Sequence, residues 1–387
     1  MLFALMANAN SQSLNKKQDK RKSLCHLSLC TISDQERDMT LLDESQAKIA
    51  WNDFTSRFRG KVPFSYNPSL YYFYKEYFGW KPYYILLQHE GNTQAILPLV
   101  HTGKAWVSLP HFSYGGMLSV RSFQGKTSTI LKIVDLLENK QLSPGFYQFD
   151  ISDEDKEDEF SKRRLLIIRG IAPMTSVQPA SEKTVSYMEI SGSKDELWKQ
   201  LSPNLRRKIR KAEVLGLDVS TGGYELVDDF YKVYSKRMHQ LGSPAYAKRF
   251  FKVLMKSVDE AKFFVVHYEG KAVGAAFVLA YQGFYESAWF ATDRNFWKFY
   301  VADFLNGSIL TYVAEQKGKV YSLGRSTEKG TVFQYKNHWP VKNDALFVYS
   351  TVERPSIRKY TGLSELWKII PGVVARSLGP VFVRHIY

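Results

Sequence analysis

The densest group of residues with chemical potential lies in the segment YSLGRSTEKGTVFQYKNHW. Arg325 and Ser326 directly follow what reads as a short strand, a position where mixed helix and strand chains commonly bind ligands. Lys336 lies between Tyr335 and Trp339. An ammonium group beside aromatic rings either makes a cation–π contact or is partly desolvated, ready to contact an anion or a carbonyl oxygen. Aromatic packing alone is the alternative interpretation.

A second candidate is the basic segment NLRRKIRKAEVLGL. Arg206, Arg207 and Arg210, with two lysines, cover most of a predicted helix surface, while one stripe stays apolar. Forked guanidinium groups match the oxygens of a phosphate, so the pattern favours a phosphate site on nucleic acid, a nucleotide or a pyrophosphate cofactor. A solvated helix face explains the same pattern without a ligand.

Several other chemistries lack their signatures. The chain contains no Gly-x-Ser-x-Gly, His-Glu-x-x-His, Walker A or Gly-x-Gly-x-x-Gly motif. Its eight histidines are scattered, and its two cysteines, Cys25 and Cys30, have no histidine pair nearby. We therefore expect neither a metal site nor a disulfide framework.

The elements that must position these residues are helices and antiparallel strands. In the first half, one helix is predicted to begin at Asp43 and a second, short helix to end at Gly79. Strands and a turn follow. Further helices are predicted at residues 128–140 and from the acidic stretch 153–159. The second half is predicted to begin with a helix that is broken near Pro203 and ends at Gly216, followed by helices at about 224–241 and 246–258. Three strands are predicted next, at 262–269, 272–281 and 284–292, joined by turns at Glu269-Gly270 and Gln282-Gly283. A helix through 304–316 and a short strand at 320–324 follow.

The length of the chain indicates how many domains it forms, and its net charge indicates which partners it fits. The 387 residues predict two domains, and a hydrophobic fraction of 44% excludes a wholly disordered chain. The 53 basic and 38 acidic residues leave a net charge of +15, which fits nucleic acid, a phosphorylated cofactor or an anionic membrane surface. No apolar run approaches the ~18 residues that cross a bilayer, so we expect a cytoplasmic protein, at most peripheral to the inner face of the membrane.

The predicted organisation has four parts. Residues 1–40 are polar and read as a disordered arm, 41–192 form a first domain, and 193–350 form a second domain. Residues 351–387 form a basic tail, in which six basic residues stand against two acidic ones, a net charge of +4.

Several segments, in order along the chain, resemble successive motifs of FemAB-like proteins of the GNAT acyltransferase superfamily. They are especially similar to the FemAB-like proteins found beside exosortase or polysaccharide-export loci. The segments are WKPYYILLQHEGNTQAILPLV, VSLPHFSYGGMLS, LSPNLRRKIRKAEVLGLDV, RMHQLGSPAY, YSLGRSTEKG and FQYKNHW. The resemblance covers about residues 45–350. The chain departs from the family's final Phe-Lys-x-x-Trp-Gly, because Pro340 replaces the glycine.

The resemblance implies an α/β (α+β) fold of two tandem GNAT-like domains, each a mixed, mostly antiparallel sheet flanked by helices. It implies transfer of an acyl or aminoacyl group to an amine of a cell-envelope or polysaccharide-related acceptor. No cofactor would be tightly bound, and the donor co-substrate would be acyl-CoA or aminoacyl-tRNA. The family loop that holds coenzyme A pyrophosphate is absent after FYESAWFAT, which weakens acetyl-CoA and keeps tRNA open as a partner.

On this hypothesis Lys336 is a catalytic cation that stabilises the oxyanion, and Arg325 positions the reacting groups. The other predicted contacts are substrate-binding Ser326, Tyr246, Trp289, Trp339 and Tyr335, and phosphate-binding Arg206, Arg207 and Arg210. The general base stays open between Glu286, Asp293 and proton transfer assisted by the substrate itself.

Two other classes of function fit the same sequence. A non-catalytic protein that binds tRNA or another polyanion would use the basic helix but would not need Lys336. A scaffold peripheral to an anionic membrane would rely on the basic tail at 351–387.

Overall fold

The computed structural model describes residues 39–103, 105–120, 133, 143–150, 166–170, 180–350 and 361–384. The predicted disordered arm lies outside these residues up to residue 38. The predicted helix at 128–140, apart from Ile133, and the helix predicted at 153–159 also lie outside them.

The first half begins with strand β1 (Met39–Leu42) and helix α2 (Glu44–Ser56). The carboxylate of Asp43 accepts hydrogen bonds from the backbone N–H groups of Ser45 and Gln46, so it caps the helix where the sequence predicts a start. A short helix, α3 (Leu70–Phe73), continues as a π-helical turn over Tyr74–Phe78. Gly79 ends it with φ +65°, the left-handed conformation that favours glycine.

Strands β2 (Lys81–His89) and β3 (Asn92–His101) form the central hairpin of the first half. Their neighbours in the sheet are β6 (Gly145–Asp150), which is parallel to β2, and the short strand β4 (Trp106–Val107), which is antiparallel to β3. The two-residue strand β5 (Leu118–Ser119) also pairs with β3.

The second half contains the helices and strands predicted for it, and also a strand at Leu217–Gly222 and a short helix at Thr331–Lys336 that the sequence did not predict. Its helices are α5 (Lys194–Gln200), α6 (Pro203–Val214), α7 (Val227–Gln240), α8 (Lys248–Ser257), α9 (Val301–Glu315) and α10 (Thr331–Lys336). Its strands are β9 (Leu217–Gly222), β10 (Ala261–Tyr268), β11 (Lys271–Tyr281), β12 (Phe284–Thr292), β13 (Val320–Thr327) and β14 (Lys342–Ser350). The break predicted near Pro203 is confirmed, because Ser202 caps a new helix and Pro203 occupies its first turn.

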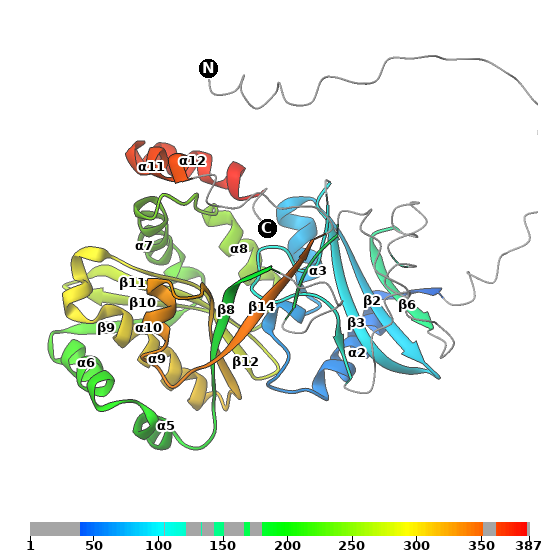
Figure 1. Cartoon of the computed structure of the whole chain (residues 1–387), viewed down its shortest axis with the longest axis horizontal. Coiled ribbons are helices and arrows are strands. Elements are labelled where there is room, and N and C mark those ends of the chain that lie inside the picture. The colour runs from blue at the N-terminus through cyan, green and yellow to red at the C-terminus, as the bar shows by residue number, and fades with distance from the viewer. Residues whose placement is uncertain are drawn as a thin grey trace, which may run out of the picture. The chain divides into compact units, whose positions relative to one another are not determined.

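The two halves are joined through hydrogen-bonded strands (Figure 1). The strand order is β1-β6-β2-β3-β4-β7-β14-β8-β13-β12-β11-β10-β9, where β7 is Leu166–Gly170 and β8 is Ala180–Glu189. Most pairs are antiparallel, and helices flank the strands in both halves, so the predicted fold class is confirmed. The predicted domain boundaries stay a prediction, since β8 and β14 continue the pairing from one half to the other.

Alternating residues of β11 fill two cores. Phe277 and Leu279 face α7 and α8 and belong to a core that also contains aromatic residues of the first half. Val278 and Ala280 face α5, α6 and α9 on the other side of the sheet. Because a strand turns successive side chains to opposite faces, one apolar strand supports both helical layers.

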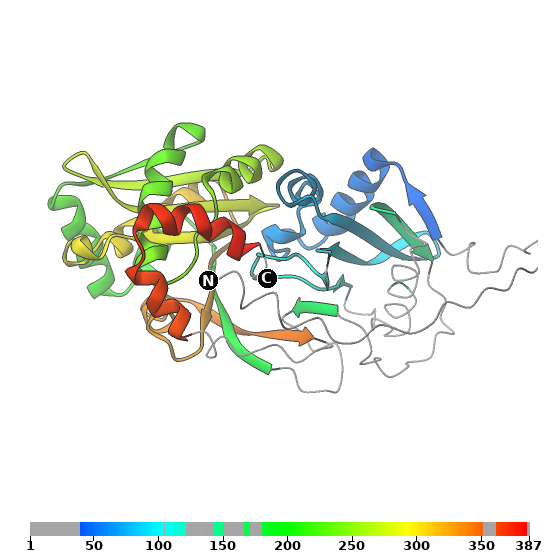
Figure 2. The same ribbon diagram turned by 90° about the horizontal axis from the view of Figure 1, so that it is seen from above.

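The C-terminal part of the chain forms two helices, α11 (Thr361–Ile369) and α12 (Gly372–Val383). Figure 2 shows α12 in red, extending toward the first half. The Nε2 atom of His239, in the last turn of α7, lies 2.9 Å from the carbonyl oxygen of Ile370 between the two helices. The predicted basic tail is therefore helical over these residues.

A buried polar contact ties α2 to the second half. The hydroxyl of Tyr281 donates to the side-chain oxygen of Asn52 at 2.8 Å and lies 2.8 Å from the hydroxyl of Thr55. The next residue, Gln282, accepts a hydrogen bond from the backbone N–H of Gly60 through its carbonyl oxygen. A hydrogen bond between buried groups is costly to lose because the remaining partner cannot reach water.

We therefore expect Tyr281→Phe to lower the free energy of unfolding by about 1–2 kcal/mol, as for loss of buried hydrogen bonds. Urea denaturation at neutral pH measures it. Tyr224→Phe is the matched control, because the Tyr224 side chain is exposed and its hydroxyl makes one long contact to the carbonyl of Lys252. Equal destabilisation by both variants would contradict a specific role for this contact.

Candidate active site

The candidate site lies where two parallel strands separate. β12 and β13 pair only at Phe284–Val320, Tyr285–Tyr321 and Glu286–Ser322. Beyond that point β13 continues against β8 and β12 continues against β11. The end of this short parallel ladder brings residues of both strands together with the end of α10.

The sequence suggested that Arg325 and Ser326 directly follow a short strand, and this is wrong. They lie within β13, which extends to Thr327, next to an irregularity in its pairing with β8. Gly324 has φ +73°. The physical reason is that β8, distant in sequence, supplies pairing partners for Arg325 to Thr327 and so lengthens the strand.

Lys336 ends α10 and is 5% exposed. Its Nζ donates hydrogen bonds to the carbonyl oxygens of Gly324 at 2.7 Å and Arg325 at 3.1 Å. Burial lowers the pKa of the Lys336 amine to about 7, the carboxylate of Glu286 opposes this shift, and the Arg325 guanidinium adds to it. The amine therefore loses its proton far more readily than the amine of an exposed lysine.

Glu286 is the buried acidic partner of this group. It lies on β12 and is 1% exposed. Burial raises the pKa of its carboxyl, while a hydrogen bond with Ser113 and the charges of Arg325 and Lys336 act in the opposite direction. Its Oε2 atom has no hydrogen-bond partner among the residues the structure describes.

The segment HFSYGGMLS of the first half completes this group. The Arg325 guanidinium reaches the carbonyl oxygen of Phe112 at 3.5 Å, and the hydroxyl of Tyr114 lies 3.2 Å from the Oγ of Ser322. The segment is one of the motifs that carry the family resemblance, but no role was predicted for its residues. Its proximity to Arg325 depends on folding of the two halves together, so spacing alone carried no signal for it.

Two of the predicted substrate-binding residues, Tyr246 and Trp289, contact the same segment. The rings of Tyr246 and Trp289 are 5.9 Å apart, edge to face. The hydroxyl of Tyr246 lies 2.9 Å from the Nδ1 of His111, and Trp289 contacts the ring of Phe112 at 6.2 Å. The structure thus brings Tyr246 and Trp289 to the segment that Arg325 also reaches.

The other three predicted substrate-binding residues, Tyr335, Trp339 and Ser326, lie in different surroundings. The hydroxyl of Tyr335 accepts a hydrogen bond from the side-chain amide of Asn306 at 3.0 Å, which in turn accepts one from the hydroxyl of Tyr321. Trp339 is 3% exposed, within the core that faces α5, α6 and α9. Ser326 is also buried, and its hydroxyl makes no hydrogen bond to another described residue.

The predicted phosphate-binding arginines do not converge on one point. Arg206 approaches the carbonyl oxygens of Trp198 and Lys199, and Arg207 donates to the side chain of Asn204. The guanidinium of Arg210 lies 5.5 Å from the centre of the Trp198 ring. Arg207 and Arg210 remain exposed on the helix surface.

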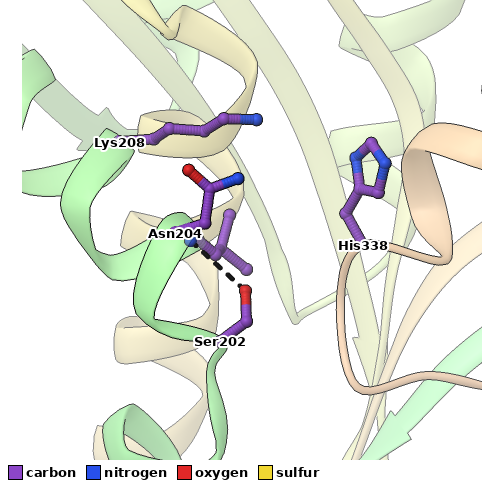
Figure 3. Close-up of a pocket in the computed structure, with 5 residues that line it drawn as sticks. Ser202, Asn204, Lys208 and His338 are labelled. Atoms are coloured by element: carbon purple, nitrogen blue, oxygen red, sulfur yellow. Dashed lines mark hydrogen bonds between the residues drawn. The ribbon is translucent and has the colours of Figure 1, made fainter.

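A pocket of about 160 Å³ lies beside the first turn of α6. It is lined by Ser202, Asn204, Leu205, Lys208 and His338. Figure 3 shows Lys208 and His338 extending from opposite sides, one from α6 and the other from the turn after α10. The Nζ of Lys208 lies 3.8 Å from the carboxylate of Asp303 on α9. No role was predicted for His338 from the sequence, because its position opposite α6 depends on packing between segments that are far apart in the chain.

No group of three His, Cys, Asp or Glu residues in the part of the chain that the structure describes could hold a metal ion. Within the same residues no helix is long and apolar enough to cross a membrane.

Residues 199–337 match the family model described as an acetyltransferase (GNAT) domain. The matched segment runs from the end of α5 to just past Lys336, so it contains the separating strands and α10. The chain carries a GNAT domain. The predicted resemblance to the GNAT superfamily is thereby confirmed for the second half of the chain.

Several solved structures resemble this chain over most of its length. FemX is 12% identical with a TM-score of 0.50, covering 84% of this chain and 100% of FemX. A conserved protein of unknown function from Bacteroides thetaiotaomicron VPI-5482 is 7% identical with a TM-score of 0.50, covering 81% and 98%. A tandem GNAT protein from the clavulanic acid pathway is 9% identical with a TM-score of 0.48, covering 82% and 99%. A search of curated proteins found no match. The likeness to FemX shows a common fold.

The lowered pKa of Lys336 predicts a pH dependence of stability. In the unfolded chain its pKa returns toward 10.5, so between about pH 7 and 10 the unfolded state binds more protons than the folded state. The free energy of unfolding should therefore rise with pH across this window. Lys336→Met should reduce this rise, measured by urea denaturation at several pH values. Lys342→Met, at an exposed lysine, should keep the wild-type slope, and an unchanged slope in Lys336→Met would contradict the assignment.

Proposed function

We propose that this GNAT protein is an N-acyltransferase, moving an acyl or aminoacyl group from an activated donor to an amine. The observation that supports it best is the buried amine of Lys336, held by two backbone carbonyl oxygens at the point where β12 and β13 separate. A cation fixed in a desolvated place stabilises developing negative charge far better than one in water.

The proposed reaction begins when the nitrogen of the acceptor amine attacks the donor carbonyl carbon. A C–N bond forms and the carbonyl oxygen becomes an oxyanion, which the protonated Lys336 stabilises. Two N–H groups of that ammonium donate hydrogen bonds to the carbonyl oxygens of Gly324 and Arg325, and the third N–H group is left to donate to the oxyanion. The oxyanion then collapses, the C–S or C–O bond to the donor breaks, and the leaving thiolate or alkoxide takes the proton from the attacking nitrogen.

The two candidate bases differ in their surroundings. Asp293 forms an ion pair with Lys236 at 2.6 Å and accepts a hydrogen bond from the backbone N–H of Asn295, so its carboxylate is already engaged. Glu286 is buried beside Lys336, and its negative charge favours the protonated form of the lysine. We therefore propose that Glu286 keeps Lys336 charged. The leaving group of the donor, and not a protein base, then accepts the proton of the attacking amine.

The proposed donor is acyl-CoA or aminoacyl-tRNA, and both carry phosphate groups. Phosphate would bind at α6, where Lys208 extends to the pocket beside the first turn and Arg207 and Arg210 remain exposed. The proposed acceptor is an amine of a cell-envelope or polysaccharide precursor in the cytoplasm. The sequence resemblance to FemAB-like proteins supports this choice.

A second function, binding of tRNA or another polyanion without catalysis, is favoured by the exposed arginines of α6 alone. The two proposals differ at Lys336. Catalysis requires its ammonium, whereas binding of a polyanion to the outer surface of α6 does not.

Lys336→Met should lower kcat by at least about 100-fold, because it removes the proposed oxyanion partner while keeping a side chain of similar length. The measurement is transfer of a labelled acyl or aminoacyl group to an amine acceptor, with acyl-CoA and charged tRNA offered separately. Lys342→Met is the control and should keep wild-type turnover. Turnover unchanged in Lys336→Met would leave the non-catalytic binding protein as the better proposal.

Lys208→Ala should raise the KM for the donor about tenfold with kcat little changed, because one charge-assisted contact to phosphate is lost from the pocket. The same transfer assay at varied donor concentration measures it. Lys194→Ala is the matched control, since Lys194 lies on the neighbouring helix α5 and pairs on the surface with Glu315. A donor KM equal to that of the wild type would place the phosphate elsewhere.

A further inference from the structure

Half of the large apolar side chains that the described structure leaves exposed lie within α11 and α12. They are Leu366, Ile369, Val373, Val374, Leu378, Val381 and Phe382. The remaining ones are scattered over seven other places in the described residues. Single exposed apolar residues are ordinary, but a continuous group marks a surface that contacts another partner.

Helix α12 turns its larger apolar residues away from the protein. Ala375, Gly379 and Val383 recur every fourth residue and are buried against the body. A Cβ atom at Gly379 would lie 2.6 Å from the carbonyl oxygen of Ala245, so the backbones approach closely there. The opposite face carries Val373 and Val381, which are 66% and 63% exposed. A surface helix of a water-soluble domain normally has the reverse arrangement.

Helix α11 extends this apolar surface. Its Trp367 contacts Phe382 of α12 edge to face, with ring centres 5.4 Å apart. Leu366 and Ile369 are 61% and 78% exposed. The two helices are short and neither could cross a bilayer, so an apolar partner would meet them side-on.

The charges around this surface indicate which partner it fits. Helix α12 contains no acidic residue, and Arg376 is exposed on it. Arg384, just past its end, donates a hydrogen bond to the carbonyl oxygen of Phe78. Lys368 of α11 is exposed beside its single acid, Glu365, and the sequence from 351 to 387 has the net charge of +4 counted above. A second copy of this chain would bring like charges together, whereas anionic lipid headgroups would neutralise them.

We propose that α11 and α12 form a membrane-binding face that lies in the plane of an anionic bilayer surface. The valine and leucine side chains enter the boundary between headgroups and acyl chains, and the basic side chains contact the lipid phosphates. This binding does not depend on the proposed acyl transfer, because its contacts come from helices outside the candidate active site.

The test is co-sedimentation of the full chain with vesicles of phosphatidylglycerol and phosphatidylcholine in equal parts, and with vesicles of phosphatidylcholine alone. Wild-type protein should bind the anionic vesicles, and raised salt should weaken binding. Val374→Asp with Val381→Asp should lower the partition at least about tenfold, because both charges enter the proposed contact. Val214→Asp is the matched control, since Val214 is 87% exposed on α6, and it should bind as the wild type does.

A milder pair, Val374→Ser with Val381→Ser, should weaken binding in the same direction and guards against unfolding by the aspartates. Equal partition of both pairs and the wild type would overturn the proposal. So would equal binding to phosphatidylcholine alone, which would remove the role of lipid charge. Gel filtration in which the wild type forms a dimer that the aspartate pair separates, without vesicle binding, would assign the face to a second copy.

Discussion

The buried contact between the Lys336 amine and the carbonyl oxygens of Gly324 and Arg325 is the constraint on which the site depends. Removing an amine from water is costly, and here backbone carbonyls and the carboxylate of Glu286 offset that cost. The contact fixes the end of α10 against β13 at the place where β12 and β13 stop pairing. An amine held this firmly can act on a substrate without rearranging, which is what stabilisation of a transition state requires.

The charged side chains around this contact also meet the first half of the chain. Glu286 and Lys336 belong to the second half, but Ser113 bonds to the carboxylate and Phe112 accepts from Arg325. Strands β8 and β14 and a shared aromatic core hold the halves together. The segment at 199–337 that matches the GNAT model therefore contains Lys336, Arg325 and Glu286, and the first half contacts two of these side chains.

Local features were predictable because they depend on neighbouring residues. The turns at Glu269-Gly270 and Gln282-Gly283 both have positive φ in the structure, and they join the three predicted strands. The helix start at Pro203 likewise needed only its own cap. By contrast α10 was not predicted, since its six residues, TVFQYK, have no pattern long enough to distinguish a helix from a loop.

The sequence by itself determined most helices and the three consecutive strands of the second half, the basic character of α6, and the choice of Lys336 and Arg325 as candidates. Residue type and short spacing carry that information. Only the tertiary structure decided that Glu286 is the buried partner of Lys336, that His338 faces Lys208, and that α12 buries its small residues. Each of these depends on contacts between segments far apart in the chain. Burial and hydrogen bonding at such contacts are set by packing of the whole fold, which local pattern does not encode.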